Sequence, residues 1–261
     1  MNILKKIVAR KKVEVETLKR REVSSLLPDN NVKHHSLMAA LSQEPYPRVI
    51  AEVKKASPSA GLLVDNFDPP SLAMAYKKGG AAALSVVTDE HFFQGELAWL
   101  ANLKLLVDLP LLRKDFIIDP LQVQESRAAG ADAILLIAAI LSQDELQELL
   151  DIAAGQGLEC LVEVHDEKDL KKVLSTTAVI IGINNRNLEN FTVDLETTLR
   201  LRKLIPADRL VVSESGIDRH AQLIRLAAAG VQGVLVGTSL VRSGDRAAKL
   251  RELILGHDAN L

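Results

Sequence analysis

VIAEVKKASPS, residues Val49–Ser59, is an apolar run that becomes charged at its right-hand end and then breaks into a turn. Runs of this length without strict alternation are typical of parallel strands covered on both faces. Burying charged and amide groups at one end of such strands costs free energy unless that end is a functional site. The pattern therefore predicts an opening at the carboxyl ends of the strands, the mouth, that holds an active site. Five further runs have this form: LPLLRKDFII from Leu109, LECLVEVHD from Leu158, AVIIGINNRN from Ala178, RLVVSESG from Arg209 and VQGVLVGTS from Val231.

Segments with helical spacing separate these runs, and two more apolar runs, Ala83–Val87 and one from Asp132, raise the total to eight strand-helix units. Strict alternation of eight units predicts an α/β fold, a closed (β/α)8 TIM barrel with right-handed crossovers. A doubly wound open sheet is the alternative, although no glycine fingerprint follows the first strand. We expect one domain over residues 1–261, in which residues 1–45 form an N-terminal helical extension packed on the barrel. Its eight basic residues, between Lys5 and Arg21, read as a solvated helical face.

Composition excludes several classes of protein. A formal charge of -2, from 32 basic and 34 acidic residues, argues against a nucleic-acid binder. No apolar stretch approaches about 18 residues and no signal peptide is recognisable, so we expect a cytoplasmic protein without a membrane partner. Cys160 is the lone cysteine and fits a small core residue, and the six histidines lack metal-ligand spacing, so no metal is expected. We expect a monomer, or at most a weak dimer.

The candidate catalytic residues lie at strand ends, where barrel active sites form. Glu52 and Lys54 are two apart and share a strand face, whereas Lys55 points to the helix side. Lys114 ends the third strand and Glu163 approaches the end of the fifth. Two nearby lysines would lower each other's pKa and a carboxylate would oppose this, giving a donor and an acceptor near neutral pH. The alternative is a buried ion-pair network that closes the barrel, with Asp115 orienting Lys114 or pairing with Arg113.

Polar groups for a substrate follow the later strands. Asn184 and Arg186, at the exit of the sixth strand, suit a hydroxylated or anionic ligand, whereas Asn185 and Asn187 fit loop caps. Small turns suited to phosphate occur at Ser57–Ser59, Ser213–Gly216 and Gly237–Ser239. The last two follow strands seven and eight, the habitual phosphate site of this fold. A phosphorylated small molecule is therefore the expected partner.

At these residues the chain resembles the indole-3-glycerol-phosphate synthase family of tryptophan biosynthesis. The motifs EVKKASPS, LRKDFIID, EVH, GINNRNL, VSESGI and LVGTSL occur in family order across nearly the whole chain. The resemblance implies a carboxy-lyase, a carbon-carbon lyase that needs no cofactor. It would close the ring of 1-(2-carboxyphenylamino)-1-deoxyribulose 5-phosphate and remove carbon dioxide and water, yielding indole-3-glycerol phosphate.

The resemblance also implies roles. Lys114 matches the general acid that protonates the ketone oxygen, and Glu163 and Lys54 match the acid-base groups of decarboxylation and dehydration, in an order left open. Glu52 and Asn184 would hold the leaving hydroxyl, with Arg186 near the anthranilate end. The remaining matches surround the phosphate or the benzene ring: Ser57, Ser215, Gly216, Gly237 and Thr238 for the former, and Phe116, Leu135, Leu188 and Leu235 for the latter.

The chain departs from the family pattern at two positions. Ala60 stands after SPS where many relatives have Lys, which puts closure of the first loop in doubt, and Leu121 replaces a common Tyr. Two other functions remain open, namely another phosphate-binding barrel isomerase or a non-catalytic sugar-phosphate-binding barrel. Such an isomerase would need a cysteine at the end of the first strand, but Cys160 begins the fifth. A non-catalytic binding module would need no proton donor and acceptor.

Overall fold

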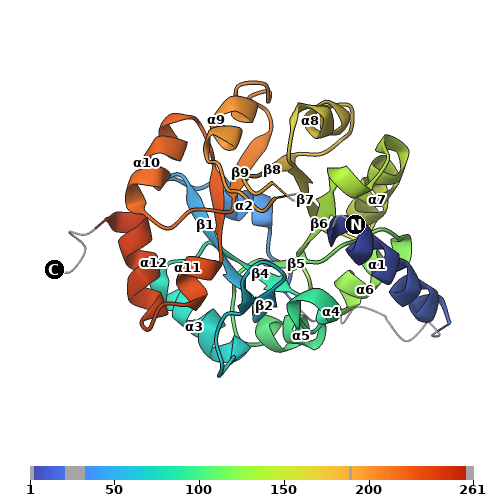
Figure 1. Cartoon of the computed structure of the whole chain (residues 1–261), viewed down its shortest axis with the longest axis horizontal. Helices are drawn as coiled ribbons and strands as arrows, with labels where there is room; N and C mark the ends of the chain where they lie inside the picture. The colour runs from blue at the N-terminus through green and yellow to red at the C-terminus, as the bar shows by residue number, and fades with distance from the viewer. Residues whose placement is uncertain (1–2, 21–32, 188–189, 257–261) are drawn as a thin grey trace.

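The computed structural model describes residues 3–20, 33–187 and 190–256, and its centre is a closed barrel of eight parallel strands (Figure 1). Each strand pairs with the next along the chain, and the last closes the ring on the first. The (β/α)8 prediction is thus confirmed, and the open sheet is excluded. The strands are β1 (Arg48–Val53), β4 (Ala83–Val87), β5 (Leu111–Lys114), β6 (Ala133–Ile137), β7 (Glu159–Val164), β8 (Ile180–Asn184), β9 (Leu210–Glu214) and β10 (Gly233–Val236).

Helices cover the outside of the barrel between the strands. Several begin with residues that favour a helix start: Pro120 opens α6, and Ser142 and Glu145 form a capping box at the start of α7. Gly130 follows α6 with a φ of +89°, as a helix-ending glycine should. The covering helices are α3 (Pro69–Gly79), α5 (Ala98–Lys104), α6 (Pro120–Ala128), α7 (Gln143–Gly155), α8 (Glu167–Leu174), α9 (Glu196–Arg202), α10 (His220–Ala228) and α12 (Arg246–Leu255).

Strand alternation divides the apolar side chains into two cores. On β1, Ile50 faces the barrel interior, whereas Ala51 and Val53 pack with the outer helices. The same alternation turns Glu52 and Lys54 inward, as predicted. The middle of the interior is therefore an apolar plug, and the inward-facing side chains become polar at the carboxyl ends of the strands.

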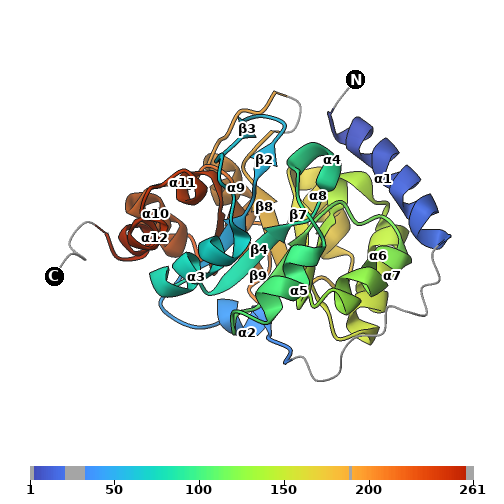
Figure 2. The same ribbon diagram turned by 90° about the horizontal axis from the view of Figure 1, so that it is seen from below.

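The leader contributes to both ends of the barrel. Helix α2 (Leu37–Leu41) buries Leu37 and Leu41 in the interior core, at the end opposite the mouth (Figure 2). Helix α1 (Ile3–Lys19) lies beside the mouth (Figure 2). The expectation of a wholly solvated basic face is wrong at Lys11, which is 3% exposed because it pairs with buried acids. That residues 1–261 form one domain stays a prediction.

Some short elements were not predicted from the sequence, and they lie in the loops around the mouth. A two-stranded hairpin, β2 (Ala56–Ser57) and β3 (Gly61–Leu62), follows β1. The others are single helical turns: α4 (Glu90–Phe93), η2 (Ala138–Ile140) and α11 (Thr238–Val241). Within the described residues, no helix combines the length and apolar character needed to cross a bilayer.

Candidate active site

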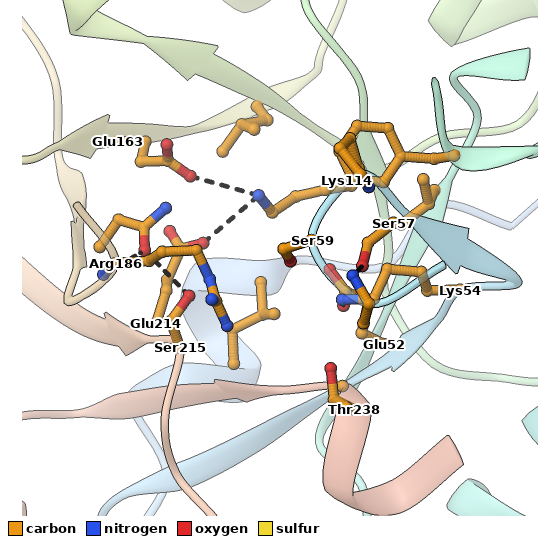
Figure 3. Close-up of a pocket in the computed structure, with 18 of the residues that line it drawn as sticks. Glu52, Lys54, Ser57, Ser59, Lys114, Glu163, Arg186, Glu214, Ser215 and Thr238 are labelled. Carbon is orange, nitrogen blue, oxygen red and sulfur yellow. Dashed lines mark hydrogen bonds and ion pairs between the residues drawn. The ribbon is translucent and has the colours of Figure 1, made fainter. Parts of the chain in front are cut away.

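A cavity of about 660 Å³ lies at the carboxyl ends of the strands. Every described residue that the sequence predicted for the site lines it, whereas Leu188 falls outside the described residues. The side chains come from strands and loops around the whole ring, so the cavity is the mouth predicted from the strand ends (Figure 3). The lining also includes Ile3, Leu4 and Ile7 of α1, which the sequence did not suggest.

Lys114 lies at the centre of the charged groups. Its Nζ is 3.2 Å from Oε2 of Glu163 and 3.5 Å from Oε2 of Glu214, so it points between the two carboxyl groups (Figure 3). Burial alone would lower the pKa of Lys114, but the two acids reverse this and raise it above its ordinary value. The expected mutual lowering by a pair of lysines is therefore wrong for Lys114, because its close partners are acids.

Glu163 and Glu52 sit on opposite sides of the mouth. Burial would raise the pKa of Glu163, but Lys114, His165 and the Asn184 amide together lower it below its usual range. Glu52 is buried and accepts a hydrogen bond from Lys54. A Cβ at Gly237 would lie 2.2 Å from Oε2 of Glu52, so only glycine leaves room for this carboxylate.

Glu214 is the functional candidate that sequence reasoning missed. It is 2% exposed, lines the cavity, and leaves Oε1 without a hydrogen-bond partner among the described residues. Burial, with Glu163 and Glu52, raises its pKa to about 8 despite the opposing effect of Lys114. Its signal was present in the sequence, as the acid of SESG at a strand end. Gly182 makes space for it, since a Cβ there would be 2.3 Å from Oε1.

Asn184 connects the carboxyl ends of β8 and β9. Its Oδ1 accepts hydrogen bonds from the Ser215 hydroxyl at 2.9 Å and from the Arg186 N–H at 3.0 Å. Asn185 turns away into the protein, where it bonds to Ser213 at 3.0 Å and to Thr198, as a loop cap should. The network fixes the Asn184 amide, and the Arg186 side chain donates to the Phe191 carbonyl at 3.2 Å.

The lining of the cavity combines polar turns with apolar side chains. Ser57, Gly237 and Thr238 line it, as do Ser215 and Gly216, whose φ angles of +71° and +79° form a tight turn. Such exposed backbone turns suit an anion. Apolar side chains supply the other walls: Phe116, Leu135 and Leu235 as predicted, with Phe93 and Ile7 in addition.

Asp115 and Lys55 differ in their relation to the cavity. Asp115 lines the cavity and pairs with Arg113 at 3.1 Å, as one of its two expected roles required, and also with Lys11 at 2.8 Å. Lys55 does not line the cavity, in keeping with its expected place on the outer face of the strand.

Comparison with known proteins agrees with this geometry. The profile of the family described as "Indole-3-glycerol phosphate synthase" matches residues 4–253. A protein of that name from Sulfurimonas denitrificans is 50% identical over 221 residues, covering 85% of this chain and 84% of the relative. Another from Desulfotalea psychrophila is 46% identical, covering 97% of this chain and 98% of the relative. A solved 3-hexulose-6-phosphate synthase shares the fold, with a TM-score of 0.65 and 14% identity over 79% of this chain and 97% of that one. The chain therefore belongs to the indole-3-glycerol phosphate synthase family.

Proposed function

We propose that this protein is an indole-3-glycerol phosphate synthase, a carboxy-lyase acting on 1-(2-carboxyphenylamino)-1-deoxyribulose 5-phosphate. The observation that carries the proposal is the ammonium of Lys114 held between the buried carboxyl groups of Glu163 and Glu214, inside a cavity lined by glycine- and serine-containing turns and by apolar side chains. A module that only bound a sugar phosphate would have no need to bury these two acids beside the Lys114 ammonium.

The shape of the cavity supports one orientation of the substrate. The phosphate would lie against the turns at Ser215 and Gly216 and at Gly237 and Thr238, with Ser57 beside them. The benzene ring would pack among the apolar walls, where Leu188 would join Phe116, Leu135 and Leu235. In this orientation the ketone would lie near Lys114 and the carboxylate near Arg186, whose guanidinium offers a planar fork.

The first step would join the ring carbon that bears the carboxylate to the ketone carbon. Lys114 would donate its proton to the ketone oxygen as that bond forms, which stabilises the charge that develops there. Carbon dioxide would then leave, and the electrons of its bond would restore the aromatic ring. An apolar surrounding favours this loss of charge.

The second step would expel the new hydroxyl as water while the neighbouring CH2 group loses a proton. Glu163 and Lys54 would supply the acid and the base, and Glu52 and Asn184 would hold the hydroxyl. We add Glu214 to this set, as a protonated carboxyl that donates a hydrogen bond to the substrate, since its pKa is raised to about 8. Overall one proton is consumed, because a carboxylate leaves as neutral carbon dioxide.

Incubation with the carboxyphenylamino-deoxyribulose phosphate tests the proposal. We expect the fluorescence of an indole product and the release of one carbon dioxide per product, without added metal or cofactor. No signal at high enzyme concentration would contradict the synthase, and tight binding without turnover would identify a non-catalytic barrel instead. Light scattering would test the expected monomer in the same sample.

A further inference from the structure

His165 follows β7 two residues after Glu163 and lies behind that carboxylate as seen from the cavity. Its Nε2 is 3.2 Å from Oε1 of Glu163, and its Nδ1 is 3.6 Å from Oδ2 of Asp169 in the first turn of α8. The imidazole does not line the active-site cavity. It lines a second groove instead.

The second groove has a volume of about 990 Å³ and opens beside the active site. It runs between α1, α8 and the loop before α9, and Asn184 and Arg186 line both spaces. Charged groups face it from each of these elements: Lys5 and Lys12 from α1, Asp166, Lys168 and Asp169 around α8, and Arg186, Asp194 and Arg200 around α9. The imidazole borders this groove, while both of its ring nitrogens are buried.

The surroundings of His165 favour its charged form. Burial would lower the pKa of this imidazole, but Asp169 and Glu163 outweigh it and raise the pKa to about 10. At neutral pH the ring is then a cation between two acids. Asp169 also accepts a hydrogen bond from the His165 backbone N–H at 3.3 Å, which fixes the turn that carries the ring.

The buried carboxyl groups of the mouth require positive charge nearby to stay ionised. Glu163, Glu214 and Glu52 are all at most 5% exposed. Facing Glu163 are Lys114 from β5, Glu214 from β9 and the Asn184 amide from β8. Lys114 is shared between Glu163 and Glu214, and Lys54 is engaged by Glu52. His165 is then the cation that touches Glu163 without serving another carboxyl of the cavity.

We propose that His165 is a positioning residue, which holds Glu163 ionised and in place by contact from the second groove. The inference rests on the proposed function, in which Glu163 enters the cycle as a carboxylate next to Lys114. Removing the imidazolium should let Glu163 accept a proton at a higher pH, and activity would then fail earlier as the solution is acidified. The alkaline side of the profile should change little, because Lys114 and Glu214 keep their own contacts.

The test compares the pH dependence of kcat in wild type and in His165→Gln. A cation within about 4–6 Å lowers a carboxyl pKa by roughly one unit or more, so the acid limb should rise by about one pH unit in the variant. We expect kcat at the optimum and KM to stay within about threefold of wild type. His165→Lys, which restores a cation, should return the limb toward wild type.

Lys168→Gln is the matched control, since it removes one positive charge from the same groove without touching Glu163. Its profile should equal that of wild type. An unmoved acid limb in His165→Gln, or a uniform loss of kcat at every pH that lysine does not rescue, would overturn the inference.

A second readout separates this inference from the proposed function. The carboxyl carbon of Glu163 can be followed by NMR during an acid titration, with Glu163→Gln assigning the signal. Its midpoint should rise in His165→Gln whether or not the protein turns over this substrate. If His165→Gln fails to fold, His165→Lys and His165→Asn are compared in the same titration, and equal midpoints would overturn the inference. Failure of the synthase assay in wild type would contradict only the proposed function.

Discussion

The ammonium of Lys114 lies 3.2 Å from the carboxylate of Glu163, a contact that bridges two strands of the barrel which are not neighbours. We predict that Lys114→Ala abolishes turnover, because the donor for the ketone oxygen is lost. Substrate affinity should stay within about tenfold, roughly 1.4 kcal/mol, since the phosphate turns and apolar walls are untouched. Single-turnover kinetics and equilibrium binding measure the two quantities separately.

Lys55→Ala is the control for Lys114→Ala, because Lys55 does not line the cavity. It should keep wild-type turnover. A large loss of affinity in Lys114→Ala would contradict the prediction and make Lys114 a binding anchor. Thermal unfolding of each variant shows whether the two uncompensated acids have weakened the barrel.

Glu214 gives a second prediction, from its pKa of about 8. At pH 6.5–7 it is mostly a neutral carboxyl, so the uncharged donor in Glu214→Gln should keep kcat within about tenfold of wild type. Glu214→Ala removes the donor and should lose about a hundredfold or more. As pH rises through about 8, wild-type Glu214 ionises, so any part of the alkaline limb due to Glu214 should be missing from Glu214→Gln. Equal losses in both variants would contradict a hydrogen-bond role.

The strand pattern predicted the barrel and most of the mouth, because both depend on local features. Parallel strands buried on both faces need apolar runs, and a charged residue at the end of such a run is visible without a structure. Lys114 and Glu163 were found in that way. Glu214 has the same signal at the end of β9. The serines and glycine around it indicate a phosphate site instead, so the sequence did not single out its carboxyl group.

Lys11 and His165 could not be placed from the sequence for a different reason. Lys11 matters through Asp89 and Asp115, which are distant along the chain, and helical spacing alone does not distinguish a buried lysine from a solvated one. His165 matters through acids on the adjoining strand and helix, whose approach to the ring depends on the turn between them. The hairpin β2–β3 is likewise too short for a strand pattern. Such features depend on how loops pack over the mouth, which is a property of the whole fold.

Gly237 supports a third prediction. A Cβ there would lie 2.2 Å from Oε2 and 3.1 Å from Cδ of Glu52, so Gly237→Ala must displace this carboxylate or the turn beside it. We expect kcat/KM to fall by about a hundredfold or more, because about 1 Å of misplacement can cost that much. Gly244→Ala is the control, since a Cβ at Gly244 meets nothing within 4 Å. Unchanged kinetics in Gly237→Ala would show that Glu52 can move without consequence.

The fourth prediction concerns the attachment of α1 to the barrel. Nζ of Lys11 lies 2.8 Å from Asp115 and 2.9 Å from Asp89, which ties the helix to the ends of β5 and β4. Lys11→Met leaves these acids without that cation, and breaking a buried ion pair costs on the order of 3 kcal/mol of unfolding free energy. KM should rise about tenfold, because Ile3 and Ile7 of the same helix line the cavity, while kcat changes little.

Lys19→Met is the control that shows whether the effect of Lys11→Met comes from its own ion pairs or from any loss of contacts made by α1. Lys19 pairs with Asp119 at 3.4 Å from the far end of α1, but it is largely exposed, so its loss should change stability little and leave KM unchanged. The acid dependence adds a third criterion. Burial would raise the pKa of Asp115, but Arg113 and Lys11 lower it to about 2. The stability from ionised Asp115 is therefore present above about pH 4 and disappears as pH falls toward 2. In urea unfolding, the free energy of unfolding should fall less steeply with pH across that range in Lys11→Met than in wild type. Equal slopes would mean that Lys11 does not stabilise the ionised form of Asp115.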